Sequence, residues 1–132
     1  MRRVAVDTSV WVQYLRGRDE SVRRSMHVLL DEDRVTMPVP VRIEILSGLR
    51  RGDTRRLLPV LDAIPTFLPD DGTWETMERW AIESASRGER FGVGDLLIAA
   101  LSSCNDCSIW SLDSDFHRLS DMGFVDLFEP EG

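Results

Sequence analysis

The stretch Arg-Arg-Val-Ala-Val-Asp-Thr-Ser-Val-Trp-Val at residues 2–12 carries the pattern that decides the fold. Arg2–Val6 is short and ends in three apolar residues, which is typical of a buried strand. The residues Asp-Thr-Ser at 7–9 follow at once, and all three are good caps for the start of a helix. Ser9–Leu15 then predicts a short helix that Gly17 closes. The stretch therefore predicts a buried strand that leads directly into a helix.

The same alternation of strand and helix continues along the chain. Apolar residues at helical spacing predict further helices over Ser21–Asp31, Val41–Leu49, Thr54–Ile64, Thr73–Gly88, Asp95–Ser103 and Phe116–Ser120. Shorter apolar stretches predict strands over Val35–Met37, Phe67–Leu68, Ser108–Leu112 and Val125–Phe128. Gly52 is expected to end the third helix, and Pro59 to bend or split the fourth. Such alternation indicates the α/β class, with a parallel sheet wrapped by helices.

The length and the cysteines are consistent with one ordinary domain. The 132 residues predict a single domain over residues 1–132, with a core that needs no disulfide or metal. The sequence contains neither an apolar run near the ~20 residues of a membrane span nor a secretory leader, so we expect a cytoplasmic protein. Cys104 and Cys107 form a lone C-x-x-C, which falls short of the four ligands of a structural zinc site. We expect reduced thiols without a metal or redox role.

The charged residues exclude several classes of enzyme. Acidic residues outnumber basic ones by 23 to 16, and residues 67–132 hold 14 of the acids but only 4 arginines. An acidic chain is a poor general binder of nucleic acid, unless metal ions reverse the local charge. The chain contains no lysine, which excludes Walker-type nucleotide hydrolases, Schiff-base enzymes and kinases. Its two histidines leave little room for histidine-dependent catalysis.

Three aspartates stand where predicted strands end or predicted helices begin. Asp7 follows the first strand, Asp95 opens the apolar run Leu-Leu-Ile-Ala-Ala-Leu, and Asp113 follows the strand that ends at Leu112. Each of them could simply cap a helix. Ligand-binding groups of a parallel sheet, however, gather at the carboxyl ends of its strands. The three aspartates are therefore candidates for one shared site.

Glu44 and Asp115 are two further acids that could belong to this site or have a structural role. Glu44 lies among apolar residues of a predicted helix, where a carboxylate needs a partner or a metal; alternatively it is an exposed residue paired with Arg42 or Arg51. We expect Asp115 to cap the helix that begins near Phe116, and Asp113 to be the site acid.

Clustered carboxylates repel one another and have raised pKa values unless cations bind among them. Carboxylate oxygens are hard ligands, which suit Mg²⁺ or Mn²⁺ better than zinc. Such an ion activates water and stabilises a reacting phosphate. Because no lysine or nearby histidine offers an alternative, metal-dependent hydrolysis of a phosphodiester is the chemistry that these residues favour.

The sequence resembles a PIN domain of the VapC type. The resemblance rests on Val-Asp-Thr-Ser-Val-Trp-Val at 6–12, Tyr-Leu-Arg-Gly at 14–17, the helical Glu44, Asp-Leu-Leu-Ile-Ala-Ala at 95–100 and Ser-Leu-Asp-Ser-Asp-Phe at 111–116. It implies an α/β/α sandwich and a Mg²⁺-dependent endoribonuclease, the toxin of a toxin–antitoxin pair, in which Mn²⁺ can substitute. The implied acids are Asp7, Glu44, Asp95 and Asp113, of which Asp7, Asp95 and Asp113 bind metal. The implied supporting residues are Ser9, Asp115 and Ser111, which stands where the family often has Thr.

The resemblance also implies partners: an RNA substrate, a VapB-type antitoxin and a second copy of the chain in a homodimer. Trp11, Tyr14 and Leu15 on the first predicted helix could form a partner surface, although large apolar residues more often pack in the core. Arg50–Arg56 could follow RNA phosphates or be an ordinary solvated helix junction. The alternatives are an RNA-processing nuclease of the same fold without an antitoxin, and a non-catalytic acidic module such as a phospho-receiver. Receivers use a lysine, which this chain does not have.

Overall fold

A four-stranded parallel sheet forms the centre of the molecule in the computed structural model, which describes residues 1–50 and 52–130. The strands are β1 (Val4–Val6), β2 (Val35–Pro38), β3 (Thr66–Phe67) and β4 (Ser108–Trp110), in the spatial order β3-β2-β1-β4. β1 is an inner strand, and its three residues are at most 1% exposed. Burial on both faces explains why its sequence is continuously apolar rather than alternating.

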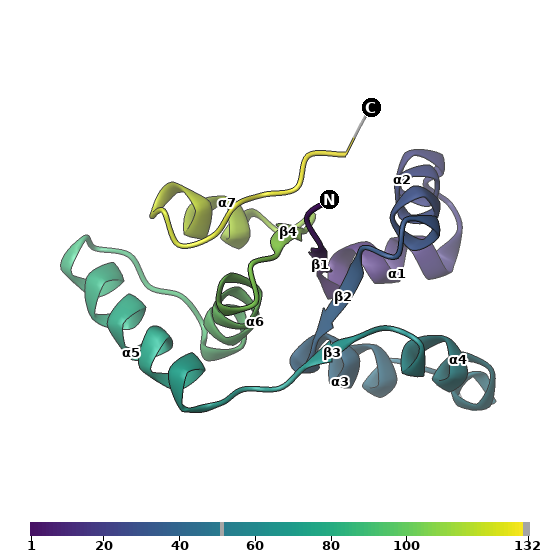
Figure 1. Ribbon diagram of the computed structural model, residues 1–132, viewed down its shortest axis with the longest axis horizontal. Coiled ribbons are helices and arrows are strands. Elements are labelled where there is room, and N and C mark those ends of the chain that lie inside the picture. The colour runs from purple at the N-terminus through teal and green to yellow at the C-terminus, as the bar shows by residue number, and fades with distance from the viewer. Residues whose placement is uncertain (51, 131–132) are drawn as a thin grey trace.

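Helices cover both faces of this sheet. They are α1 (Thr8–Arg16), α2 (Glu20–Asp31), α3 (Val39–Ser47), α4 (Asp53–Asp62), α5 (Asp71–Ser86), α6 (Val93–Cys104) and α7 (Ser114–Asp121). Figure 1 shows α1, α2 and α4 on one side of the strands, and α5, α6 and α7 on the other. α3 starts directly after β2 and packs against both α1 and α6. The predicted sandwich of helices around a parallel sheet is confirmed.

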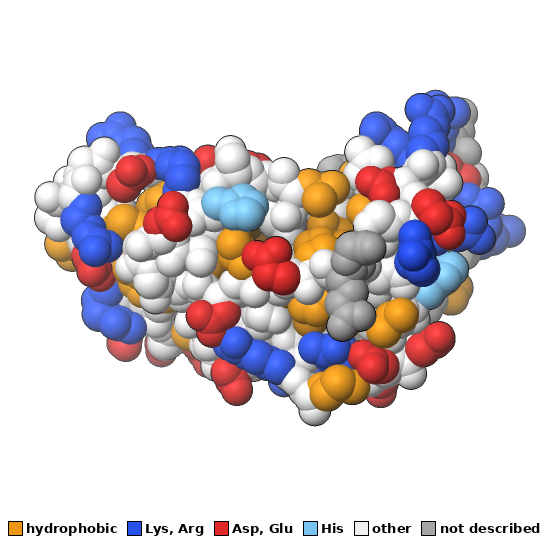
Figure 2. Space-filling view, turned by 90° about the horizontal axis from the view of Figure 1, so that it is seen from above, with side chains coloured by type: hydrophobic (Ala, Val, Ile, Leu, Met, Phe, Trp, Pro, Cys, Tyr) orange, Lys and Arg blue, Asp and Glu red, His pale blue; other side chains and the backbone are white. Residues whose placement is uncertain are grey.

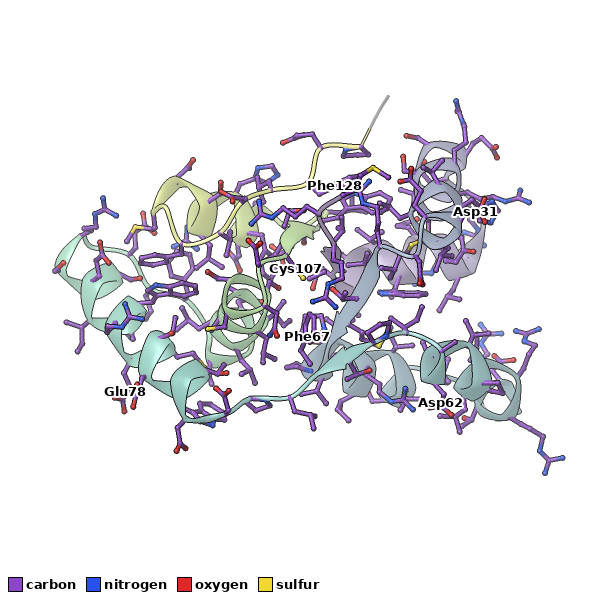
Figure 3. All side chains as sticks on the ribbon, in the orientation of Figure 1. Asp31, Asp62, Phe67, Glu78, Cys107 and Phe128 are labelled. Atoms are coloured by element: carbon purple, nitrogen blue, oxygen red, sulfur yellow. The ribbon has the colours of Figure 1, made fainter. Side chains whose placement is uncertain are left out.

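The core combines the sheet with the inner faces of the helices. Trp11, Met26 and Phe116 are at most 1% exposed, and the rings of Trp80 and Phe124 stack with their centroids 4.6 Å apart. Cys107 is buried close to β4, near the centre of Figure 3, and both cysteines are free thiols. Among the described residues, no helix combines the length and the apolar character needed to cross a bilayer.

Most predicted elements occur, with shifted ends. Gly17 closes α1 in the left-handed conformation, with φ of 67°, as its position predicted. α3 ends at Gly48, four residues before the predicted Gly52. α4 continues through Pro59, so the helix is not split there. Proline removes one N–H donor, and the carbonyl that loses its partner belongs to the solvent-exposed Arg55, which water can satisfy.

Val125–Phe128, predicted as a strand, forms only an isolated parallel bridge. Ile109 donates its N–H to Asp126 at 2.9 Å and accepts from the N–H of Phe128 at 2.7 Å. Two bonds bind this segment beside β4 at the edge of the sheet, and they are too few for a regular strand.

Candidate metal centre

Asp7 lies where the first strand meets the first helix. β1 and β4 pair in parallel with Val6 opposite Trp110, so the residues that follow them, Asp7 and Ser111, meet at the same edge of the sheet. The Asp7 side chain is 7% exposed and also accepts the N–H of Ser9 as the N-cap of α1. The capping and site interpretations of Asp7 are therefore compatible with each other.

Two serine hydroxyls hold one oxygen of Asp7. Ser9 Oγ and Ser111 Oγ each lie 2.8 Å from Asp7 Oδ2. The same hydroxyls accept backbone N–H groups, Ser9 from Leu112 at 2.9 Å and Ser111 from Asp113 at 3.0 Å. Among the described residues no hydrogen bond goes to Asp7 Oδ1, so one carboxylate oxygen is oriented and the other stays available for a ligand.

Asp95, Asp113 and Asp115 form a cluster of carboxylates. Each offers an oxygen, and these oxygens lie within 4.8 Å of one another. Asp95 is in the first turn of α6, whereas the other two stand at the start of α7. The contact between these helices thus brings together residues about twenty positions apart in the chain. Glu78, an exposed acid of α5, does not belong to this cluster and projects from the outer side of that helix in Figure 3.

The capping role predicted for Asp115 belongs to Asp113. Because β4 ends at Trp110, two residues before the predicted end, α7 begins earlier, at Ser114. Asp113 then occupies the N-cap position and accepts the N–H of Asp115 at 3.0 Å. Asp115 points its carboxylate to Asp95 and to Arg118 instead. Both acids are therefore at the cluster, and Asp113 is also the helix cap.

Burial and the neighbouring acids both raise the pKa of Asp95. Burial, a hydrogen bond with Asp115 and the charges of Asp115, Asp113 and Asp7 raise the pKa of Asp95 to about 6. Asp7 is outside the group of three, but its charge reaches Asp95. A cation bound among these carboxylates would favour the ionised form of Asp95 and lower this pKa.

Glu44 stands at the edge of the same region, on α3. Its residue is exposed, yet partial burial of the carboxyl raises its pKa; the neighbouring Thr8 hydroxyl opposes this effect and the Asp7 charge adds to it. The alternative pairing with Arg42 is wrong, because that arginine binds Asp62 at 2.6 Å. Arg51, the other pairing that the sequence allowed, lies outside the described residues. Glu44 is thus close to Asp7 without belonging to the cluster of three.

Arg118 is the residue at this site that the sequence did not single out. Its Nη1 lies 3.0 Å from Asp115 Oδ1, and its other terminal nitrogen binds Glu89. The spacing of Asp115 and Arg118, three apart on one helix, is a signal for such a pair, although most pairs of this kind are only surface salt bridges.

The donor set fits a hard divalent cation. Every candidate ligand is a carboxylate oxygen, and sulfur and imidazole are absent from the described cluster. Oxygen ligands of this type suit Mg²⁺ and Mn²⁺. One face of the molecule has acidic and basic side chains interspersed, without a continuous basic strip (Figure 2). An acidic site could attract a phosphate only through a bound cation.

Of the predicted partner surface, little is exposed. Trp11 is buried at 1% exposure, and Tyr14 is half-buried with its ring against those of Trp11 and His27. Leu15 alone of the three is exposed, at 41%. It lines a groove of about 620 Å³ between α1, α3 and α4. The other residues that line this groove are Val12, Arg16, Glu44, Ile45, Gly48, Leu49, Arg50, Asp53, Arg56 and Leu57.

Comparison of the sequence and the structure with known proteins identifies relatives of this chain. Residues 4–122 match the PIN domain family. Ribonuclease VapC11 of Mycobacterium tuberculosis is 31% identical over 118 residues, which are 86% of this chain and 88% of the relative. The structure of VapBC-1 from nontypeable Haemophilus influenzae has a TM-score of 0.76 at 18% identity and matches over 96% of both chains. FitAcB from Neisseria gonorrhoeae has a TM-score of 0.76 at 22% identity, over 96% of this chain and 97% of the other. The two structural matches support the fold alone.

Proposed function

This chain belongs to the PIN domain family, among the VapC ribonucleases, and from that premise we propose that it is a Mg²⁺-dependent endoribonuclease, the toxin of a toxin–antitoxin pair. The carboxylate cluster of Asp95, Asp113 and Asp115 beside Asp7 is the observation that carries the proposal. We further propose that residues 1–132 are one PIN domain, which acts in the cytoplasm on RNA.

Asp7, Asp95 and Asp113 are the residues that would hold the ion, with Asp115 beside them and Glu44 completing the acidic set. When bound, Mg²⁺ or Mn²⁺ supplies an activated water and stabilises negative charge on the scissile phosphate. The chain itself supplies the orientation of the ligands. Ser9 and Ser111 keep Asp7 Oδ2 in hydrogen bonds, and the Asp95 carboxylate, ionised above its pKa of about 6, would bind the cation.

The groove between α1, α3 and α4 is the surface that best suits the antitoxin. Its apolar residues, such as Leu15 and Leu57, could receive an amphipathic segment, while Arg16 and Arg56 offer charges at its margin. Glu44 lies both in this groove and next to Asp7, so an occupant would reach the edge of the acidic site. The proposal therefore predicts that an antitoxin inhibits by contact with the site region. Trp74 and Ile82, exposed on α5, are available for a homodimer.

RNA cleavage by the purified protein tests the enzymatic proposal. Single-stranded RNA should be cut with Mg²⁺ or Mn²⁺ and left intact with EDTA. Asp95→Asn should lower the rate by at least about 100-fold, because it removes a metal ligand while keeping the shape of the side chain. Glu78→Gln, which removes an exposed acid from α5, is the matched control and should cleave as the wild type does. Cleavage that survives EDTA or Asp95→Asn contradicts the proposal.

The antitoxin needs a separate experiment, since an RNA-processing nuclease would share the chemistry. The protein should form a stable complex with the product of an adjacent small gene, and that complex should cleave RNA more slowly than the free protein. An active nuclease that no neighbouring gene product inhibits would be the processing enzyme instead.

A further inference from the structure

The guanidinium of Arg118 touches three successive residues of one loop and one acid of the cluster. Nη1 donates to Asp115 Oδ1 at 3.0 Å. Nη2 donates to the Glu89 carboxylate and, at 3.3 Å, to the Arg90 carbonyl. The guanidinium carbon also lies 4.5 Å from the centre of the Phe91 ring. The side chain of one α7 residue is thus the meeting point of residues 89–91 and Asp115.

The loop that Arg118 holds leads directly into a proposed metal ligand. Residues 87–92 connect α5 to α6, and Asp95 lies in the first turn of α6. Gly92 in this loop has open space where a side chain would be, so little packing restrains this end of the loop. Glycine also has more backbone freedom to lose than other residues. The contacts of Arg118 with residues 89–91 fix the loop immediately before the helix that carries Asp95.

We propose that Arg118 is a positioning residue of the metal site, which joins the loop before Asp95 to Asp115 and thereby holds these two carboxylates within ligand distance. This inference rests on the proposed function, because it assumes that the cluster binds a divalent cation. Arginine suits the task because its planar fork of donors binds several acceptors at once, whereas lysine presents a single point charge.

Arg118 affects cation binding through the placement of the carboxylates rather than through its own charge. Glu89 binds the same guanidinium and offsets its charge, so little positive charge remains to occupy the place of a cation. The contact with Asp115 uses Oδ1 only, which leaves the second oxygen of that carboxylate free of the arginine. If Arg118 acted as a resident counter-ion, removing it would strengthen cation binding; if it positions ligands, removing it weakens binding.

Titration with Mn²⁺, followed by electron paramagnetic resonance of the free ion, measures this directly in the absence of RNA. We expect Arg118→Gln to weaken Mn²⁺ binding by about 10-fold or more, the usual effect of losing a residue that orients a metal ligand. Arg118→Lys should not restore the affinity, because one ammonium cannot reach both Asp115 and the loop. Arg87→Gln is the matched control: this arginine is in the same loop and contacts Met122 and Glu83, neither of which belongs to the carboxylate cluster. It should bind Mn²⁺ as the wild type does.

Hydrogen exchange of the metal-free proteins gives a second, independent readout. Amides of residues 88–95 should exchange several-fold faster in Arg118→Gln than in the wild type or Arg87→Gln, while β1 and β4 stay protected. Wild-type affinity in Arg118→Gln, tighter binding, full rescue by Arg118→Lys or unchanged exchange would each overturn the positioning role. A wild-type protein that binds no Mn²⁺ would overturn the proposed function instead, and the exchange measurement would still decide whether Arg118 anchors the loop.

Discussion

Asp7 and Ser111 stand 104 positions apart in the chain, yet the Ser111 hydroxyl donates a 2.8 Å hydrogen bond to Asp7 Oδ2. The contact follows from the parallel pairing of β1 with β4, which places the first residue beyond each strand at one edge of the sheet. Ser9 donates to the same oxygen from the first turn of α1. Strand pairing and helix capping therefore combine to orient a single carboxylate for a ligand.

Ser111→Ala tests whether this orientation matters for catalysis. We expect metal affinity to fall by about 10-fold, because the partner of a ligating carboxylate is lost. Stability should fall by only about 1 kcal/mol, the usual value of one hydrogen bond. Mn²⁺ titration, RNA cleavage and thermal melts measure these effects. Ser111→Thr keeps the hydroxyl and should restore binding, and Ser86→Ala, on an exposed face of α5, should change nothing. Equal affinity of Ser111→Ala and the wild type would contradict the prediction.

The metal-free protein should become more stable as the pH falls from 7.5 to 5. The pKa of Asp95 is raised to about 6 in the folded state, so the folded protein binds this proton more tightly than the unfolded chain does. The ionised carboxylate thus costs stability above pH 6, and protonation relieves that cost between pH 6 and 4. Allowing for solvent screening, the gain is about 1 kcal/mol, or roughly 3–5 °C in Tm.

Asp95→Asn, which is neutral at every pH, provides the control for this pH effect. Its Tm at pH 7.5 should be higher than that of the wild type, and the rise toward pH 5 should be smaller. Saturating Mg²⁺ should reverse the order at pH 7.5, because only the wild type gains a ligand. Thermal melts of both proteins, in EDTA at pH 7.5 and pH 5 and in Mg²⁺ at pH 7.5, measure these differences. A wild-type Tm that falls steadily toward pH 5 would refute the raised pKa.

Asp113 combines two roles that single substitutions can separate. Asp113→Asn keeps a good helix cap but loses the charge, so cleavage should drop while Tm stays near that of the wild type. Asp113→Ala should also lose about 1 kcal/mol of stability, because the cap of α7 is gone. Cleavage rates and melts of the two variants should therefore agree in activity and differ in stability. Full activity of Asp113→Asn would remove Asp113 from the site.

Substitutions in α4 test whether the antitoxin binds in the groove between α1, α3 and α4. Leu57→Glu places a charge in the groove and should weaken binding of the antitoxin by at least about 10-fold, since it removes apolar contact area. Val60→Glu alters an exposed residue of α4 outside the groove lining and is the matched control. Both variants should cleave RNA normally when free. Calorimetry with the antitoxin decides the point, and equal affinity of the two variants would place the interface elsewhere.

The order of the elements was readable from the sequence because it depends on local chemistry. Val4–Val6 is apolar throughout, Asp7 has the side chain of a cap, and Gly17 tolerates the left-handed turn that ends α1. Each of these signals acts over a few residues. For the same reason, Asp7, Asp95 and Asp113 could be chosen from their places at the ends of predicted strands or the starts of predicted helices.

Which of these residues meet depends on how the elements pack. α7 begins at Ser114 rather than near Phe116, so Asp113 has the capping role predicted for Asp115, and both acids lie in the cluster. The anchoring of residues 89–91 by Arg118 likewise depends on the packing of α6 against α7. Periodicity and capping are local, so most elements and the candidate acids could be predicted from the sequence. The assembly of the site depended on non-local packing, because the contacts that orient its carboxylates join residues up to 104 positions apart.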